Sequence, residues 1–400
     1  MNRHNVYFRS IYNQKELQLA MSNIGADSPG IHVMKQKGEF FHIVIHDVNL
    51  RAANLIKQEL LSKGGDACVH KQVSQLTADH SDIMLLCTRR ELERVISNFQ
   101  SQPFGLKQLA IELKKALTCF DMKNKPTLPA WAQSLKLPLK ERTLIMGILN
   151  VTPDSFSDGG RFIAEEKAVV RALEMIDQGA DILDIGGEST RPGAVPVDIE
   201  TELQRVIPII HAIKKVTEIP ISVDTYKAEV AKAAVEAGAD MINDIWGLKK
   251  DSCMAKVAAD TQVPVIIMHN RANTLYADLI SDMISDLRES VQIAEDAGVL
   301  SENIILDPGI GFAKDYPQNL EVMYRLRDIT NLGYPTLLGT SRKSLIAKTL
   351  NLPVEERIEG TAATVALGIE RGVDIVRVHD VREMKRVCVM MDAMVRRGDA

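Results

Sequence analysis

The chain has 400 residues, a formal net charge of −5, and 46% hydrophobic and 25% charged residues. Both signs of charge are interspersed, so the composition is that of a globular protein and gives no indication of a nucleic-acid partner. No stretch approaches the ~20 consecutive apolar residues of a membrane span, and the first residues lack the apolar run of a signal peptide. The five cysteines are scattered and form no CxxC motif, which argues against a zinc site or a disulfide framework. We therefore expect a soluble cytoplasmic protein that does not bind membranes.

The length favours two domains, because most domains have ~100–200 residues and an α/β barrel has ~250. Residues 1–120 have the pattern of a small α/β domain. Its expected strands are Phe41–Ile45 and Asp82–Cys87, and its expected helices are Asn49–Lys63, Glu91–Asn98 and Lys107–Leu117. No phosphate-binding motif occurs there, and three roles stay open: oligomerisation, gating of a site elsewhere in the chain, or binding of a partner. Residues 121–140, which contain Pro and Lys, predict a linker.

Residues 141–400 alternate short apolar runs with longer amphipathic segments. The expected strands are Leu144–Val151, Ile182–Gly186, Ile221–Asp224, Met241–Asp244, Val265–His269, Ile304–Asp307, Thr336–Gly339 and Ile375–His379. Helical spacing is present, for example, at Glu165–Gln178, Lys227–Ala237 and Ser281–Ala297. This alternation indicates a parallel sheet buried on both faces. An open doubly wound sheet has the same pattern, but the number of strand–helix units favours an α/β fold of the (β/α)8 TIM barrel type.

A short phrase recurs just before three of the expected strands. Gln178–Asp181, Glu236–Asp240 and Glu370–Asp374 each end in Gly-x-Asp. We predict that each glycine ends a helix in the left-handed conformation and that a short loop follows. The phrase therefore predicts architecture and carries no chemistry.

The active site of such a barrel lies at the C-terminal ends of its strands. Every expected strand ends in polar residues. In chain order these ends are Asn150–Asp154, Gly186–Gly193, Asp224–Thr225, Asn243–Asp244, Met268–Arg271, Asp307–Gly309, Ser341–Ser344 and Arg377–Asp380. A single aspartate in such a place is as easily a helix N-cap as a catalyst, so the prediction depends on all the ends together.

Two kinds of ligand group are expected at this mouth. One set of side chains would satisfy a flat heteroaromatic ring with amidine-like N–H groups and a carbonyl, and its members are Asp224, Asn243, Asp307 and Lys343. Arg191, Arg377 and His379 would form a cationic patch for a phosphate or diphosphate. Asn150 offers a neutral oxygen that could hold Mg²⁺ together with phosphate oxygens. His269 stays open between a rim histidine with its hydrogen bonds satisfied and a functional group.

Two long motifs give this part of the chain a specific resemblance. They are Met146–Gly160, MGILNVTPDSFSDGG, and Asp184–Gly193, DIGGESTRPG. Shorter motifs follow in the family's order at Ser222–Thr225, Asn243–Asp244, Asp307–Phe312, Ser341–Ser344 and Arg377–Asp380. Over roughly residues 142 to 395 the chain resembles the dihydropteroate synthases, a family of pterin-binding TIM barrels. The preceding residues lie outside the resemblance.

The resemblance implies a transferase that joins 6-hydroxymethyl-7,8-dihydropterin diphosphate to p-aminobenzoate and yields 7,8-dihydropteroate and diphosphate. The implied pterin ligands are Asp224, Asn243, Asp307 and Lys343, the diphosphate ligands are Asn150 with Mg²⁺, Arg377 and His379, and the groups around p-aminobenzoate are Phe156, Thr190, Arg191, Pro192, Phe312, Lys343 and Ser344. The implied catalytic residues are Asp224, Asp307, Lys343 and Arg377. The family also implies a homodimer.

In the implied mechanism, cleavage of the C–O bond leaves a pterin-methyl cation that the neutral aryl amine attacks, so no strong base is needed. The loops Asp154–Arg161 and Ser189–Val197 are expected to close and exclude water. Where the family has a small-residue turn after Met-His, this chain has Met268–Ala272, MHNRA, which leaves a base role for His269 in question. Two alternatives remain: a pterin-binding methyltransferase module of the corrinoid-dependent kind, which needs no diphosphate patch, and a non-catalytic paralogue.

Overall fold

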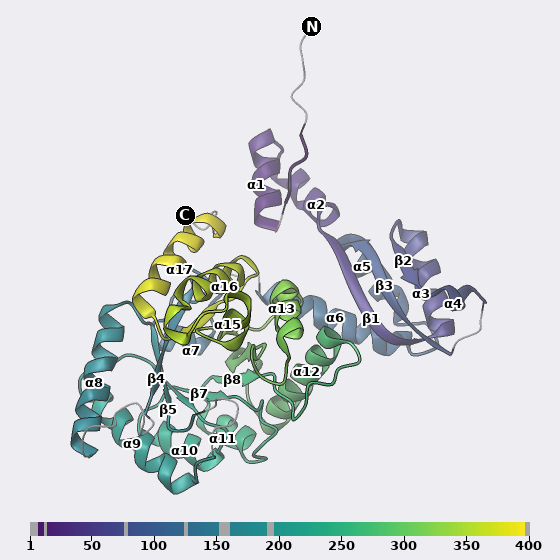
Figure 1. Ribbon diagram of the computed structural model, residues 1–400. Helices are drawn as coiled ribbons and strands as arrows, with labels where there is room; N and C mark the ends of the chain where they lie inside the picture. The colour runs from purple at the N-terminus through teal and green to yellow at the C-terminus, as the bar shows by residue number, and fades with distance from the viewer. Residues whose placement is uncertain are drawn as a thin grey trace. The chain divides into compact units, whose positions relative to one another are not determined.

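The structure, a computed structural model, describes residues 7–11, 14–75, 79–123, 127–151, 161–189 and 196–396. The chain divides into two compact units, one ending at Thr118 and the other beginning at Cys119 (Figure 1). No helix in these ranges is long and apolar enough to cross a membrane.

The N-terminal unit is built on a three-stranded antiparallel sheet in the order β1-β3-β2. Its strands are β1 (Phe40–Asn49), β2 (Asp66–Val69) and β3 (His80–Thr88). Its helices are α1 (Gln14–Ile24), α2 (Ser28–Gly38), α3 (Leu50–Lys63), α4 (Lys71–Gln75), α5 (Arg89–Phe99) and the first part of α6 (Leu106–Lys123). The α/β class expected for this region is confirmed, although β2, α1, α2 and α4 were not among the predicted elements.

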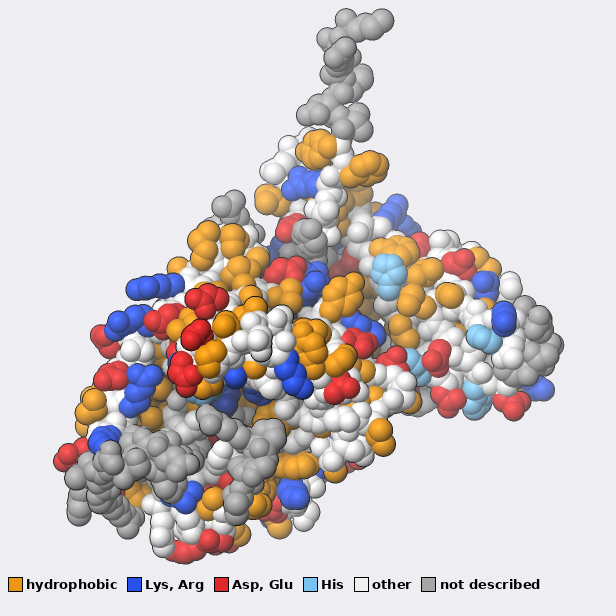
Figure 2. All heavy atoms as spheres, in the orientation of Figure 1, with side chains coloured by type: hydrophobic (Ala, Val, Ile, Leu, Met, Phe, Trp, Pro, Cys, Tyr) orange, Lys and Arg blue, Asp and Glu red, His pale blue; other side chains and the backbone are white. Residues whose placement is uncertain are grey.

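One face of this sheet is covered and the other is open. Ile83 and Leu85 of β3 pack with Ile56 of α3 and Phe99 of α5 into a buried core. The alternate residues of the strands point the other way, so Phe40, Val44 and Met84 are exposed by 52%, 48% and 38%. Figure 2 shows hydrophobic and histidine side chains together on the visible face of this unit. The period-two alternation of the strands produces both faces.

Residues 127–140 do not form a free linker. They contain α7 (Ala130–Ser134), and Trp131 and Leu139 are buried against Leu144 at the start of the first barrel strand. The indole N–H of Trp131 donates to the carbonyl of Glu302 at 2.8 Å. The prediction of a linker over 121–140 was therefore wrong in this part, because the apolar side chains close the N-terminal end of the barrel.

The second unit is a barrel of eight parallel strands in the order β10-β11-β4-β5-β6-β7-β8-β9. The strands are β4 (Leu144–Asn150), β5 (Ile182–Gly186), β6 (Ile221–Asp224), β7 (Met241–Asp244), β8 (Val265–Met268), β9 (Ile304–Asp307), β10 (Leu337–Leu338) and β11 (Ile375–Val378). A parallel bridge between Leu306 and Thr336 joins β9 to the segment that leads into β10. The sheet therefore closes on itself, which confirms the TIM barrel and rejects the open sheet.

Helices surround the strands (Figure 1). They are α8 (Arg161–Asp177), α9 (Ile199–Lys214), α10 (Ala228–Glu236), α11 (Met254–Thr261), α12 (Leu279–Ala297), α13 (Tyr316–Tyr324), α14 (Leu326–Thr330), α15 (Ser344–Leu350), α16 (Ile358–Glu370) and α17 (Val381–Val395). Two short 3₁₀ helices, Ser301–Asn303 and Val354–Glu356, lie between them. Buried aliphatic residues of strands and helices form one large core, which explains the near-continuous apolar runs of the sequence.

The recurrent Gly-x-Asp phrase has the predicted backbone conformation at its glycine, and its aspartate forms a hydrogen bond to a neighbouring strand. The three glycines have φ values of 102° at Gly179, 113° at Gly238 and 91° at Gly372. The aspartate of each phrase then accepts a backbone N–H from the start of the neighbouring strand. The donors are Ile145 at 2.9 Å for Asp181, Ile221 at 2.8 Å for Asp240, and Thr336 at 2.9 Å for Asp374.

Candidate active site

The centre of the barrel mouth is occupied by the guanidinium of Arg377, from β11. Its Nε lies 2.6 Å from Asp184 Oδ2 of β5, and its Nη2 lies 2.7 Å from Asp224 Oδ2 of β6. The amide of Asn243, from β7, donates to the same Asp184 oxygen at 3.2 Å. Four strands thus direct polar side chains to one point, and all four of these side chains lie largely out of water.

Some oxygens in this cluster have no hydrogen-bond partner among the described residues. They are Asp184 Oδ1, Asp224 Oδ1 and Ser222 Oγ. A buried acceptor without a donor costs about 1–3 kcal/mol, so such atoms in one place indicate a missing polar ligand. Burial raises the pKa of Asp224 to about 7, against the lowering effect of Arg377. The cluster is therefore suited to a ligand that presents N–H groups to carboxylates.

Asp307 and Lys343 lie on the β9 and β10 side of the same mouth. Asp307 Oδ1 accepts the backbone N–H of Gly309 at 2.7 Å. Lys343 Nζ donates to the carbonyl of Ile310 and lies 4.3 Å from the ring centroid of Phe312. Burial lowers the pKa of Lys343 to about 8, whereas the charges of Asp307 and Asp224 raise it. The carboxylates of Asp224 and Asp307 are thus both near enough to Lys343 to act on its charge.

The end of β11 is tied to the loop after β10. His379 Nδ1 lies 3.0 Å from Ser341 Oγ, and the backbone N–H of His379 donates to the same hydroxyl at 3.2 Å. Arg377 is two residues earlier but turns inward to Asp184 and Asp224. Of the predicted cationic patch, Arg377 and His379 thus have different partners in the structure, and the third member, Arg191, lies outside the described residues.

Asn150 stands at the end of β4, beside Gly186 of β5. A Cβ atom at Gly186 would lie 3.7 Å from Asp224 Oδ2 and 3.8 Å from Asn150 Oδ1, so both oxygens border this glycine. Within the described ranges, no group of three His, Cys, Asp or Glu side chains could hold a metal.

Two of the remaining predicted residues, Ser344 and Phe312, are described by the structure. Ser344 is the first residue of α15 and is exposed. Phe312 is half-buried under Lys343. Phe156, Thr190, Arg191 and Pro192 lie outside the described residues, as does most of each predicted loop.

His269 is not arranged as a base. Its Nε2 lies 3.0 Å from Asp286 Oδ2 of α12, and its Nδ1 lies 2.9 Å from Lys314 Nζ. Burial lowers the pKa of His269 to about 4, against the hydrogen bond to Asp286. Both ring nitrogens are occupied, so the structure favours the rim histidine of the two interpretations.

Sequence reasoning missed Asp184 and Lys314. Asp184 is fully buried in the middle of β5, and it stands inside the second long motif. A charged residue within an otherwise apolar strand was the available signal, because such a group is almost never buried without a partner. Lys314 follows the Asp307–Phe312 motif by two residues and gave no local signal.

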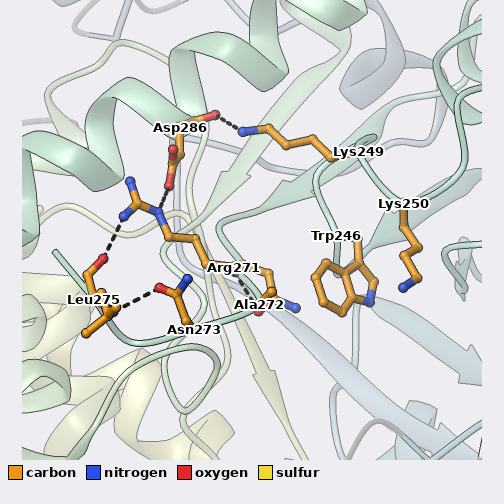
Figure 3. A pocket seen from close by; sticks show the side chains of 9 residues that line it. Trp246, Lys249, Lys250, Arg271, Ala272, Asn273, Leu275 and Asp286 are labelled. Carbon is orange, nitrogen blue, oxygen red and sulfur yellow. Dashed lines mark hydrogen bonds and ion pairs between the residues drawn. The ribbon is translucent and has the colours of Figure 1, made fainter.

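A separate pocket of about 500 Å³ lies between the loops after β7 and β8 (Figure 3). The residues that line it are Trp246, Lys249, Lys250, Asn270, Arg271, Ala272, Asn273, Leu275 and Asp286. Arg271 points to Asp286 and to the carbonyl of Leu275, and Lys250 lies 5.0 Å from the Trp246 ring centroid. None of the predicted site residues lines this pocket.

Comparison with known proteins identifies the barrel. The family model described as "Pterin binding enzyme" matches residues 146–379, so the chain belongs to the pterin-binding enzymes. Dihydropteroate synthase of Bacillus subtilis is 62% identical over 262 residues, which are 66% of this chain and 92% of that protein. The crystal structure of dihydropteroate synthase from Clostridium difficile in the presence of pteroic acid has 53% sequence identity and a TM-score of 0.64, and the match covers 65% of this chain and 99% of that one. Within its family the chain groups with the dihydropteroate synthases, which are transferases of folate biosynthesis.

One relative is also similar outside the barrel. A probable bifunctional folylpolyglutamate synthase/dihydropteroate synthase of Halobacterium salinarum is 41% identical over 371 residues, or 91% of this chain and 44% of that protein. Because the barrel unit begins only at Cys119, a match of this extent includes much of the N-terminal unit. The similarity to this relative therefore extends into the N-terminal unit, outside the motifs of the barrel.

Proposed function

We propose that the barrel condenses 6-hydroxymethyl-7,8-dihydropterin diphosphate with p-aminobenzoate and releases 7,8-dihydropteroate and diphosphate. The observation that carries this proposal is the buried Asp184–Arg377–Asp224 cluster with its unpartnered carboxylate oxygens. A pterin ring presents several N–H donors in one plane, which is what these acceptors lack. Pteroic acid, present with the Clostridium difficile enzyme, contains both a pterin and a p-aminobenzoate moiety.

In this proposal each side of the pterin ring has its own partners. Asp224 and Asp184 accept ring N–H groups, and Asn243 offers an amide that both donates and accepts. Asp307 and Lys343 stand opposite, where the ammonium of Lys343 can donate to the ring carbonyl. Because the site is buried, each of these hydrogen bonds is stronger than it would be in water.

The leaving diphosphate would be held at the ends of β4 and β11. Asn150, Arg377 and His379 are the proposed ligands, the first of them jointly with Mg²⁺. A single neutral oxygen from the protein fits an ion that usually keeps waters and binds through substrate phosphates. Mg²⁺ would supply charge neutralisation that makes diphosphate a better leaving group.

The proposed p-aminobenzoate site lies at the outer mouth. Its residues are Phe156, Thr190, Arg191, Pro192, Phe312, Lys343 and Ser344. The bond from the methylene carbon to the diphosphate oxygen breaks, and Asp224 and Asp307 stabilise the positive charge that develops on the pterin. The aryl amine then attacks the methylene carbon, and the proton that its nitrogen loses passes to the departing diphosphate or to water. The amine is nucleophilic without a base, which agrees with the engaged state of His269.

A direct assay separates this function from the alternatives. The purified chain is incubated with Mg²⁺, the pterin diphosphate and p-aminobenzoate, and 7,8-dihydropteroate is measured; in parallel, methyl transfer from methyl-tetrahydrofolate to a corrinoid acceptor is measured. We expect dihydropteroate formation and no methyl transfer. Methyl transfer alone would support the methyltransferase module, and pterin binding with neither product would support a non-catalytic paralogue.

We also propose that the chain acts in the cytoplasm as a homodimer, without membrane or nucleic-acid partners. Its mixed surface charge and the absence of long apolar helices among the described residues are compatible with that state. Light scattering at micromolar concentration tests the dimer, which would give twice the mass of the 44.3 kDa chain.

A further inference from the structure

We propose that Lys314 is a positioning residue whose buried ammonium holds the turn Asp307–Phe312 against the end of β8 and thereby places Asp307 for the pterin ring. This proposal rests on the proposed function, since it assigns Asp307 to the pterin. Lys314 itself is not expected to touch either substrate.

The contacts of Lys314 account for every proton of its ammonium group. The side chain is 8% exposed, and Nζ has three acceptors. They are the carbonyls of Gly309 and Phe312, each at 3.0 Å, and Nδ1 of His269 at 2.9 Å. An ammonium has three N–H groups, so all of them are used without water. The two carbonyls belong to the turn, and the imidazole belongs to the end of β8.

The Gly309 residue connects Lys314 to the proposed pterin ligand. Its carbonyl accepts from Lys314, while its N–H donates to Asp307 Oδ1 at 2.7 Å. Gly309 has φ 65°, and a Cβ atom there would lie 2.0 Å from the carbonyl oxygen of His269. The turn Asp307–Phe312 thus packs directly against the end of β8, and there is no space for a side chain at Gly309. Any shift of Gly309 would move the Asp307 carboxylate directly.

The same turn holds Lys343. Lys343 Nζ donates to the carbonyl of Ile310 and lies over the Phe312 ring. Lys314 fixes the residues on both sides of Ile310 through the carbonyls of Gly309 and Phe312. Its ammonium therefore stabilises a turn that contains one proposed catalytic group, Asp307, and accepts a hydrogen bond from another, Lys343.

The hydrogen bonds also define the proton on His269. Because Nδ1 accepts from an ammonium, the ring is neutral and its proton is on Nε2, which donates to Asp286. Arg271 pairs with the same carboxylate of Asp286. His269 thus links Asp286 of α12 to Lys314 through its two ring nitrogens. It contributes no proton to the reaction.

Several charges face Lys314 from the elements around it. Burial lowers the pKa of Lys314 to about 7; Asp307 and Asp286 oppose this effect, and Lys343 and Arg271 add to it. Only the charged form has three N–H groups, so at least one of the three contacts is lost when the amine deprotonates. This stabilisation of the turn should therefore weaken as pH rises through neutrality.

The test compares Lys314→Met with Lys232→Met, a control at an exposed lysine of α10. Kinetics are measured with each substrate varied separately. We expect the KM for the pterin diphosphate to rise at least tenfold in Lys314→Met, with a change of no more than threefold in the KM for p-aminobenzoate and no change in the control. An unchanged pterin KM, or equal changes in both KM values, would overturn the proposal.

A second variant keeps the test valid if Lys314→Met does not fold. Lys314→Arg keeps a cation at all relevant pH values. In the wild type the pterin KM should rise with a midpoint near pH 7, and in Lys314→Arg the rise at this midpoint should be absent even if the KM itself is higher. A rise of the same midpoint in both enzymes would refute the role of Lys314. A folded wild type without dihydropteroate synthesis would instead reject the proposed function, and the positioning role with it.

Discussion

Arg377 and Asp224 are separated in the sheet by β4 and β5, yet Nη2 of one lies 2.7 Å from Oδ2 of the other. The guanidinium therefore spans the interior of the barrel and also reaches Asp184. This pairing makes Arg377 both a proposed diphosphate ligand and the charge that compensates two buried carboxylates. Substitutions at this position should consequently affect turnover and stability together.

Replacing Arg377 with alanine should reduce turnover by roughly 10²-fold or more, because the leaving diphosphate loses a preorganised positive charge. The same change leaves two buried carboxylates without their cation, which costs about 3–5 kcal/mol of unfolding free energy. Initial rates and urea unfolding measure the two effects. Arg386→Ala, at an exposed position of α17, is the matched control. Near-normal turnover in Arg377→Ala would contradict the assignment.

The free energy of unfolding of the ligand-free protein should depend on Asp224 in acid. Burial raises the pKa of Asp224 in the folded state to about 7, above its unfolded value near 4. The protonated form is therefore the one that folding favours, and this contribution to stability is full below pH 4 and is lost as pH rises to about 7. Asp224→Asn should show less loss of stability than the wild type between pH 5 and pH 7.5 in urea titrations. Equal slopes would show that Asp224 ionises normally.

Turnover should fall as pH rises through about 8, because burial lowers the pKa of Lys343 to about that value and the neutral amine cannot supply its charge. A pH profile of kcat with both substrates saturating checks this expectation, since the role proposed for Lys314 acts on the pterin KM. Lys343→Arg should have a lower maximum, since the planar guanidinium does not reproduce the lysine geometry, but no fall in this range. Retention of the same fall in the arginine variant would assign it to another group.

Truncation should reveal where the barrel begins. A chain starting at Cys119 keeps Lys123, which donates to the carbonyls of Thr330 at 2.7 Å and Gly372 at 3.0 Å, and keeps the buried Trp131. We expect it to fold. A chain starting at Pro138 lacks both and should be less stable by about 3–5 kcal/mol, the cost of deleting one large buried aromatic side chain.

The unfolding temperature and the rate of diphosphate release are measured for the two truncated chains and for the full protein. Full activity of the chain from Cys119 would make the N-terminal unit accessory to catalysis. Equal stability of the two truncated chains would show that the segment around Trp131 does not support the barrel.

The strands of the barrel were predictable because each must bury both of its faces. Ile221–Asp224 and Met241–Asp244 have the expected bounds, and Leu144–Asn150 ends one residue earlier than expected. Of the four residues expected in β10, Leu337–Leu338 form the strand and Thr336 makes only a single bridge to Leu306. The short β2 was not predicted, because an edge strand of four residues with alternating burial resembles a loop in sequence.

The candidate site was predictable as a location but not as a set of contacts. Strand ends converge by topology, so Asp224, Asn243, Asp307 and Lys343 could be named from their places in the chain. The pairing of Arg377 with Asp184 joins residues 193 positions apart, and no local pattern encodes it. The hydrogen bonds of His269 with Lys314 and Asp286 could not be predicted for the same reason.

The carboxylate of Asp240 lies at the opposite end of the barrel from the ligand site, bonded to the first N–H of β6. Asp224 closes that same strand three residues later. A strand this short is nearly inextensible, so the Asp240 bond defines how far Asp224 projects into the mouth. The relative positions of the strands at the N-terminal end of the barrel thus determine how deeply the proposed pterin ring binds. Loss of the hydrogen bond between Ile221 and Asp240 should therefore lower the affinity for the substrate, although no residue at the substrate site is changed.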